Sequence, residues 1–205
     1  MSTKLVALTF DDGPSNITER FLDVLEEKGI VGTFFLIGNL ISPEKAPIMK
    51  RQVAMGCEIA NHSLTHNDMS KMDAETIRAE IAETTRRIEE FAGVTPHFFR
   101  PPYISLSDTM YESIDLPFIC GEDSRDWDPT TSTENRIERV LKGVKDGTLV
   151  LMHDMKDNEK TLAALPAIID GLRAEGYEFV TASEIFARKG IDPHVAHKMW
   201  SNVFD

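Results

Sequence analysis

Two aspartates, Asp11 and Asp12, stand side by side after a short apolar run in LTFDDGPS. Carboxylates this close repel each other, so the pair costs free energy unless a nearby group uses it. Neighbouring residues of a strand point to opposite sides, and the Gly13-Pro14 turn can splay them further. One carboxylate could then bind a metal ion while the other acts as a general base. An acidic pair at an ordinary Asp-Gly-Pro turn is the weaker alternative, because Ser15 is expected to cap the next helix already.

Two histidines, His62 and His66, lie four residues apart in NHSLTH. In a helical or tightly turned loop both imidazoles can face one centre, and imidazole suits zinc and its neighbours in the first transition row. By itself the pair fits two surface or capping histidines equally well. An aspartate from the adjacent pair would complete a set of two histidines and one acid, which leaves coordination positions open for water and substrate.

Three further segments place polar side chains after apolar runs. Arg100 in FFRPPY either holds a carboxylate or is a surface arginine before a turn. His153 in LVLMHDM is either a satisfied core histidine or a general acid whose pKa a nearby carboxylate raises. Trp127, beside Asp126 in EDSRDWDP, is either a platform for a sugar ring or core filling with a polar edge. From the residues alone, both interpretations stay open for each of them.

Strand-like and helix-like segments alternate along the chain. Strands are expected at residues 5–10, 30–38, 57–60, 97–100, 117–121, 148–154 and 177–183. Helices are expected at residues 15–28, 43–54, 73–91, 133–142, 161–174 and 183–188, with Ser15, Asp73 and Thr133 as N-caps. Parallel neighbours need such crossovers, and about seven units of this kind fit a closed or nearly closed α/β barrel. The polar residues fall at the carboxyl ends of the strands, where such barrels carry their chemistry.

Composition and charge exclude several classes of protein. The 205 residues, 41% hydrophobic and 27% charged, suit one soluble domain. The formal net charge of -12 offers no basic field for nucleic acid or an anionic membrane surface. No apolar run approaches the ~20 residues that cross a membrane, and we see no signal peptide. We therefore expect a cytoplasmic protein, or a secreted one if a leader was removed. Cys57 and Cys120 are expected to be buried free thiols.

Five motifs resemble, in order, those of the polysaccharide deacetylases of carbohydrate esterase family 4, also called the NodB-homology domain: TFDDGP, HSLTH, RPPY, DSRDW and LVLMHD. The likeness runs from about Lys4 to about Arg188, so we expect a catalytic domain over residues 1–189 and a C-terminal extension over residues 190–205. It implies a distorted, TIM-barrel-like (β/α) barrel. It also implies hydrolysis of an acetyl group on a sugar with a divalent metal, zinc by preference, for which cobalt or nickel can substitute.

The resemblance assigns a role to each matching residue. The metal ligands it implies are Asp12, His62 and His66. The catalytic groups it implies are Asp11 as general base, Arg100 to hold Asp11, His153 as general acid and Asp126 to tune it. The substrate contacts it implies are the Tyr103 backbone N–H for the oxyanion, and Trp127 and Leu151 around the acetyl group and the sugar.

The chain also departs from the family pattern. Ile104 stands where members often have glycine, and Cys57 stands where a polar residue is common. In the tail, His194 and His197 could suggest a second metal. We instead expect the extension to dock its large apolar residues on the barrel or on a partner subunit, namely Met199, Trp200 and Phe204.

The resemblance favours a deacetylase acting on N-acetylglucosamine units of a chitooligosaccharide or of peptidoglycan. The alternative is an O-acetyl esterase of the acetylxylan type, since the same catalytic groups can serve an amide or an ester. A non-catalytic carbohydrate-binding protein is a more distant alternative, because no ligand or base is missing. The expected partner is an acetylated carbohydrate, and the oligomeric state is left open.

Overall fold

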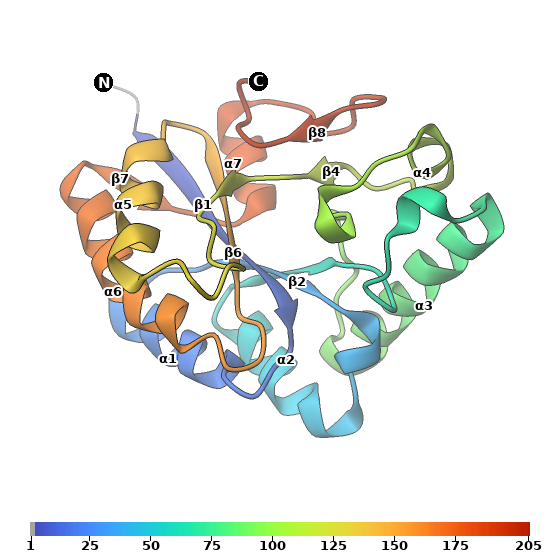
Figure 1. Cartoon of the computed structure of the whole chain (residues 1–205), viewed down its shortest axis with the longest axis horizontal. Helices are drawn as coiled ribbons and strands as arrows, with labels where there is room; N and C mark the ends of the chain where they lie inside the picture. The colour runs from blue at the N-terminus through green and yellow to red at the C-terminus, as the bar shows by residue number, and fades with distance from the viewer. Residues whose placement is uncertain (1–2) are drawn as a thin grey trace.

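Strand β1, Lys4–Gly13, is the central strand of the sheet. In the computed structural model, which describes residues 3–205, its neighbours all run parallel to it. They are β2 (Thr33–Leu36), β6 (Thr148–His153) and, near its start, β7 (Tyr177–Phe179) (Figure 1). Residues 5–10 are buried on both faces of the strand, as expected for an apolar run in a parallel sheet.

Short contacts close the sheet into a barrel. Strand β3, Glu58–Asn61, lies beside β2, and Phe99 then bridges β3 to β4 (Phe118–Ile119). The same stretch continues into β5 (Glu122–Asp123), which pairs with β6 and so completes the ring. The expected distorted (β/α) barrel is confirmed. The strand predicted at residues 97–100 reduces to this one bridge, because the prolines on both sides of it offer no N–H.

The C-terminal tail takes part in the barrel wall. Strand β8, Met199–Trp200, pairs parallel with β4, and Leu149 N–H of β6 donates to the carbonyl of Ser201. The tail therefore fills the gap that opens between β4 and β6 at the amino end of β6. Trp200 packs edge-on against Phe186 with ring centroids 5.2 Å apart.

The docking expected of the tail is met in part. Trp200 is buried and Met199 is half-buried. Phe204 is 58% exposed, so its predicted docking on the barrel is wrong, and Val203 is buried there in its place. The side chain of Val203 enters because Val203 N–H donates to the carbonyl of Gly147, which turns the chain toward the barrel.

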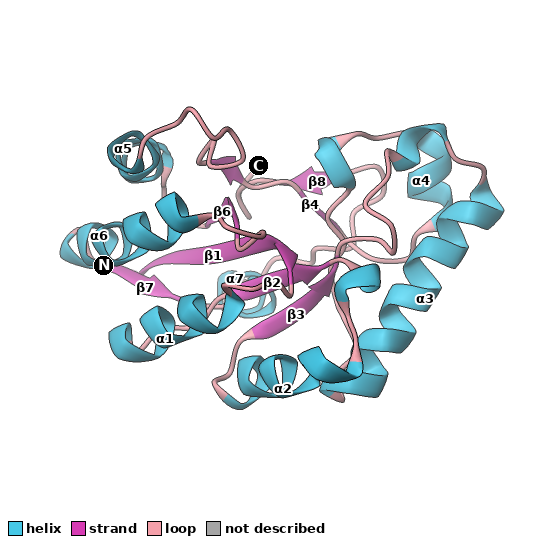
Figure 2. Ribbon diagram, turned by 60° about the horizontal axis from the view of Figure 1, so that its bottom comes forward, coloured by secondary structure: helices cyan, strands magenta, loops and turns pink. Residues whose placement is uncertain are grey.

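Helices surround the strands on the outside (Figure 2). They are α1 Thr18–Lys28, α2 Ala46–Ala54, α3 Ala74–Ala92, α4 Asp108–Ser113, α5 Thr133–Gly143, α6 Glu159–Ala174 and α7 Ala182–Lys189. Short 3-10 turns lie at Gly38–Leu40, Pro43–Lys45, Met69–Lys71 and Pro102–Ile104. Within residues 3–205, none of the helices has the length and apolar character needed to cross a membrane.

The N-cap hydrogen bonds show which of the predicted helix starts are correct. Asp73 caps α3 as predicted, since its side chain accepts from Thr76 N–H. Ser15 does not cap α1, because its hydroxyl accepts from Ile17 N–H within a turn that precedes the helix. The cap of α5 is Ser132 rather than Thr133, because the Ser132 hydroxyl accepts from Asn135 N–H.

Successive side chains of β1 point to opposite sides of the sheet and so belong to two different hydrophobic cores. Val6, Leu8 and Phe10 join the cluster between the sheet and the helices, whereas Leu5 and Ala7 join the cluster inside the barrel. The inward row continues with Thr9 and Asp11, both buried and polar. The barrel interior therefore changes from apolar to polar toward the carboxyl ends of the strands.

Both cysteines are free, as expected. Cys57 is buried, but Cys120 is only half-buried because it lines a pocket at the carboxyl ends of the strands.

Candidate active site

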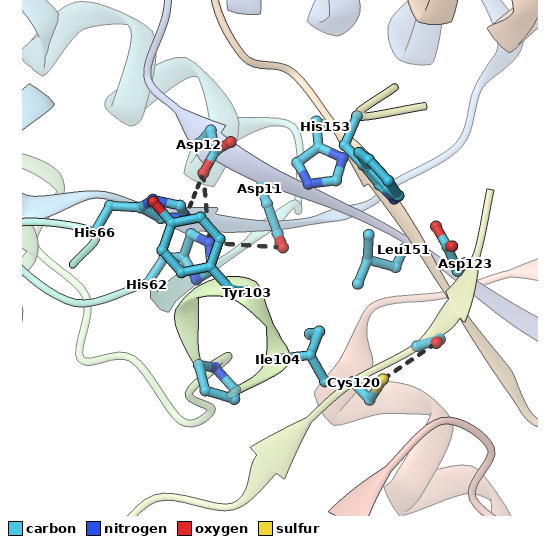
Figure 3. A pocket seen from close by; sticks show the side chains of 13 residues that line it. Asp11, Asp12, His62, His66, Tyr103, Ile104, Cys120, Asp123, Leu151 and His153 are labelled. Carbon is cyan, nitrogen blue, oxygen red and sulfur yellow. Dashed lines mark hydrogen bonds and ion pairs between the residues drawn. The ribbon is translucent and has the colours of Figure 1, made fainter. Parts of the chain in front are cut away.

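A pocket of about 460 Å3 opens at the carboxyl ends of β1, β3 and β6 (Figure 3). Most of the residues singled out from the sequence line it, namely Asp11, Asp12, His62, His66, Tyr103, Trp127, Leu151 and His153. Arg100 and Asp126 lie behind this lining, fully buried, and each bonds to a lining residue. The structure thus brings the whole predicted set together.

A bulge explains how two neighbouring aspartates reach the same site. Asp11 pairs with Phe35 of β2 and Gly13 with Leu36, so Asp12 is an extra residue in the strand. Asp12 has a φ of 69°, in the left-handed region. This local turn brings the Asp12 side chain to the pocket that Asp11 also faces. The change of direction therefore begins at Asp12, one residue before the Gly13-Pro14 turn that the sequence suggested.

Asp12, His62 and His66 form a group that could hold a metal ion. One oxygen or nitrogen atom from each lies within 4.8 Å of the others. Asp12 Oδ1 is 3.4 Å from His62 Nε2 and 3.3 Å from His66 Nε2. Residues 3–205 hold no second group of this kind. His194 instead pairs with Asp192, and His197 lies beside Asp108.

The hydrogen bonding and the ionisation of these three side chains fit a cation held between them. His62 Nδ1 is 2.7 Å from the carbonyl of Arg100, to which its N–H can donate, and this leaves the Nε2 lone pair facing Asp12. Asp12 Oδ1 is buried with no hydrogen-bond partner. Burial opposes ionisation of Asp12, but the nearby His62 imidazole, with the charges of His153 and His66, lowers the pKa of Asp12 to about 2. Two histidines and one carboxylate are a usual donor set for a catalytic zinc ion or a similar metal.

A buried acid on α3 holds the turn that carries the two histidines. Glu80 Oε2 accepts from the backbone N–H of Leu64 and of Thr65, each at 2.8 Å. Glu80 Oε1 accepts from the Thr65 hydroxyl at the same distance. This residue was missed in the sequence. The signal was present, since an acid occupies the apolar stripe of a helix between Ile77 and Thr84.

Arg100 is fully buried and holds Asp11 in place. Its Nη1 donates to Asp11 Oδ1, and its Nη2 donates to Thr9 Oγ1 at 2.7 Å. The guanidinium lies 4.1 Å from the ring centroid of Phe35. A surface arginine is therefore excluded. Removing one partner of a buried ion pair leaves an uncompensated charge, which destabilises a protein by about 3–5 kcal/mol. Asp11 and Arg100 therefore stabilise each other inside the barrel.

His153 and Asp126 form a second buried pair across the pocket. His153 Nδ1 donates to Asp126 Oδ1 at 2.7 Å, and Asp126 Oδ2 accepts from His153 N–H and from the Thr161 hydroxyl. Burial disfavours the imidazolium, but the charge and hydrogen bond of Asp126, with the charges of Asp11 and Asp12, outweigh it. They raise the pKa of His153 to about 9. His153 therefore carries a proton at neutral pH, next to the pocket.

The expected substrate contacts lie around the mouth of the pocket. Tyr103 is 68% exposed and Trp127 52% exposed, which excludes core filling for Trp127. The Tyr103 ring also packs edge-on against His66, 4.9 Å away. Leu151 is buried and forms part of the apolar lining. Two exposed aromatic rings beside a row of carboxylates and histidines are typical of a carbohydrate site.

The sequence profile of a family described as "Polysaccharide deacetylase" matches residues 1–117. The chain belongs to this family. The resemblance drawn from the five motifs is thereby confirmed, and with it the class of enzyme, a hydrolase that removes acetyl groups from carbohydrates.

Similar proteins place this domain among the carbohydrate deacetylases. It is 53% identical, over 98% of its length, to part of a "Bifunctional xylanase/deacetylase" of Pseudobutyrivibrio xylanivorans, of which it spans 33%. It is 33% identical, over 91% of its length, to a "Peptidoglycan-N-acetylglucosamine deacetylase" of Bacillus cereus, of which it covers 90%.

Solved structures agree with this placement. The Xyl-CE4 domain of a multidomain xylanase from the hindgut metagenome of Trinervitermes trinervoides has a TM-score of 0.98 and 49% identity, with 99% of each chain covered. A family 4 acetyl xylan esterase from Clostridium thermocellum, in complex with a cobalt ion, has a TM-score of 0.94 and 43% identity, covering 98% of this chain and 99% of that chain.

The deacetylase domain contains further pocket and support residues that the motifs did not indicate. Ile104, Cys120 and Asp123 also line the pocket. Asp154, which follows His153, is fully buried and accepts from the Thr18 hydroxyl. The position of Asp154, directly after His153 at the end of an apolar strand, is a signal that a sequence can show, whereas no sequence pattern connects Cys120 to the site.

Proposed function

We propose that this domain removes acetyl groups from a polysaccharide by metal-dependent hydrolysis, and that its substrate is O-acetylated xylan. The convergence of Asp12, His62 and His66 with Asp11 and His153 around one pocket supports the hydrolysis. The 49% and 43% identity to two structures with xylan-related names supports the substrate. Zinc is the proposed metal, because the donor set suits it.

The chain's own groups divide the reaction between them. A divalent cation held by the Asp12, His62 and His66 side chains would polarise the acetyl carbonyl and lower the pKa of the attacking water. Asp11, held by Arg100, accepts a proton from that water. The Tyr103 backbone N–H donates to the oxyanion as negative charge develops on the carbonyl oxygen.

His153 completes the reaction from the other side of the pocket. Its Nδ1 is engaged with Asp126, so Nε2 is free to donate a proton to the leaving sugar oxygen. The sugar hydroxyl departs and acetate remains. The same transfer to nitrogen would release an amine, so these groups serve an ester or an amide alike.

Replacing Asp11 by Asn tests the assignment of the base. Asp11→Asn keeps the shape of the side chain but removes the proton acceptor, so acetate release should fall by about 10²–10⁴-fold. The content of bound zinc should stay close to one ion per chain, because Asp12, His62 and His66 are unchanged. Asp170→Asn, on the exposed side of α6, is the matched control and should keep full activity. Full activity in Asp11→Asn would show that Asp11 is not the base.

A comparison of substrates tests the second half of the proposal. Acetate release from acetylxylan should exceed release from chitooligosaccharides and from peptidoglycan fragments at equal acetyl content. N-acetylglucosamine substrates are the second candidate, supported by the Bacillus cereus relative. Acetate release from N-acetylglucosamine substrates alone would show that the substrate is N-acetylated and is not xylan. Binding of sugars by the zinc-loaded protein without acetate release from any of them would favour a non-catalytic carbohydrate-binding protein.

A further inference from the structure

Two consecutive residues beside the pocket have left-handed backbone conformations. Tyr103 has a φ of 58° and Ile104 has a φ of 55°. Few residues other than glycine adopt this region, and for a β-branched side chain it is a genuine outlier. An isoleucine at this position is therefore unfavourable for the backbone, and glycine would fit the same conformation without strain.

The surrounding turn holds Ile104 in this conformation. Pro101 and Pro102 precede it with restricted φ values, and Ile104 N–H donates to the carbonyl of Pro101 at 3.0 Å. Ser105 N–H donates to the carbonyl of Pro102 at 3.1 Å. Strain of this kind persists only where the neighbouring structure fixes it, and it is concentrated at active sites and ligand clamps.

The Ile104 side chain occupies the apolar part of the pocket. It lines the pocket together with Leu151 and Cys120, away from the carboxylates and imidazoles of the metal group (Figure 3). Leu106, two residues later in the same loop, is 36% exposed and does not line the pocket. The strained position is therefore the one that presents an apolar side chain to the pocket.

We propose that Ile104 determines which acyl group this enzyme accepts. Its side chain, with Leu151 and Cys120, forms the wall that contacts the methyl group of a bound acetyl and leaves no room for a longer chain. Glycine at position 104 would relieve the backbone but would open this wall. This inference rests on the proposed function, since it concerns the acyl half of the same substrate.

The experiment compares acyl groups on one carrier sugar. Acetylated, propionylated and butyrylated forms are prepared of xylotriose and chitotriose, and release of each carboxylate is measured on the carrier that the zinc-loaded wild type deacetylates. Wild type should strongly prefer acetyl. In Ile104→Ala and Ile104→Gly, the ratio of kcat/KM for propionyl to that for acetyl should rise by about 10-fold or more, since one methylene in an apolar pocket is worth that much. Leu106→Ala should leave the ratio unchanged.

Thermal melting distinguishes the effect of losing the Ile104 side chain from the effect of relieving its strained backbone. Both variants remove the same side chain, but only glycine relaxes the left-handed backbone, so Ile104→Gly should melt about 2–4 °C above Ile104→Ala. An unchanged acyl ratio in both variants, or a wild type that cleaves butyryl as well as acetyl, would overturn the proposal. No acetate release by wild type from either carrier would overturn the proposed function instead.

Discussion

The environment of His153 shows how one buried carboxylate determines the protonation of a neighbouring side chain. The group is protonated below its pKa, so its ability to donate a proton is lost as the pH rises through a value of about 9. A cation at the Asp12 site would oppose the positive charge and place this alkaline limit at a lower pH. The acid therefore depends on Asp126 to remain charged over the neutral range.

Replacing Asp126 by Asn should move that limit. Asp126→Asn removes the charge that outweighs burial, so the alkaline limb of the kcat profile should shift down by about 1–3 pH units. Thr161→Val is a matched control, since it removes one hydrogen bond to Asp126 Oδ2 but keeps the charge, and its shift should be smaller. An unchanged alkaline limb in Asp126→Asn would contradict the role of His153 as the acid.

Asp154 should make the stability of the metal-free protein depend on pH. Burial, together with the charges of Asp12 and Asp11, raises its pKa from 3.8 to about 7. Between these two values the unfolded chain loses the proton while the folded chain keeps it, so stability falls as the pH rises through this window.

The variant Asp154→Asn removes this effect while it can still accept from Thr18. At pH 4 the free energies of unfolding of the two proteins should differ little. At pH 8 the variant should be more stable by up to about 4 kcal/mol, at 1.36 kcal/mol per pKa unit. Urea unfolding across this range measures the gap, and a gap that did not change with pH would refute the prediction.

At the scale of elements, helix α3 supports the metal group without touching it. Glu80 accepts from two of the three backbone N–H groups between His62 and His66, so it fixes the turn on which both imidazoles are carried. Groups that orient metal ligands in this way typically change metal affinity by about 10–100-fold when they are removed.

Replacing Glu80 by Ala should therefore weaken zinc binding by about 10–100-fold, measured by competition with a chelator. Glu80→Gln should restore most of the affinity, because its amide oxygen can still accept from the two N–H groups. Glu90→Ala, an exposed position on the same helix, should leave zinc affinity unchanged. Equal zinc affinity in Glu80→Ala and wild type would mean that the turn holds its shape without this acid.

The elements also show what a sequence can predict. Alternating strands and helices predicted the barrel, and polar residues at strand ends predicted the site, because parallel strands bring their carboxyl ends to one side. The Asp12 bulge, the left-handed Ile104 and the approach of Cys120 could not be predicted. The approach of Cys120 depends on a hydrogen bond between distant segments, from Cys120 N–H to the carbonyl of Trp200, that no local pattern records, and no residue pattern predicts an isoleucine in the left-handed region.

At the scale of the whole molecule, the C-terminal tail supports the wall on which the pocket rests. Trp200 is buried against Phe186 and pairs with Ile119 of β4, next to Cys120. The tail expected as an extension is thus paired into the barrel. The division at residue 190 and the cytoplasmic location stay predictions.

Replacing Trp200 by Ala should lower stability by about 3–5 kcal/mol, as for other buried aromatics. For a chain of this size that corresponds to a fall in Tm of roughly 10 °C. Reaction of the Cys120 thiol with a soluble reagent should also become faster, since the wall beside it loosens. Phe204→Ala, in the exposed part of the tail, should change Tm and thiol reactivity far less. Similar melting of both variants would contradict a supporting role for the tail.

The position of β1 at the centre of the sheet has a consequence for synthesis. Within this domain β1 is synthesised before its neighbours, and two of its parallel partners, β6 and β7, begin only at Thr148 and Tyr177. The gap beside β6 is filled only when residues 199–203 have followed. Contacts across such sequence separations form slowly. The nascent chain must therefore carry an apolar, unpaired strand edge until β6 and β7 have been synthesised, which makes this stage the one at which a chaperone would matter most.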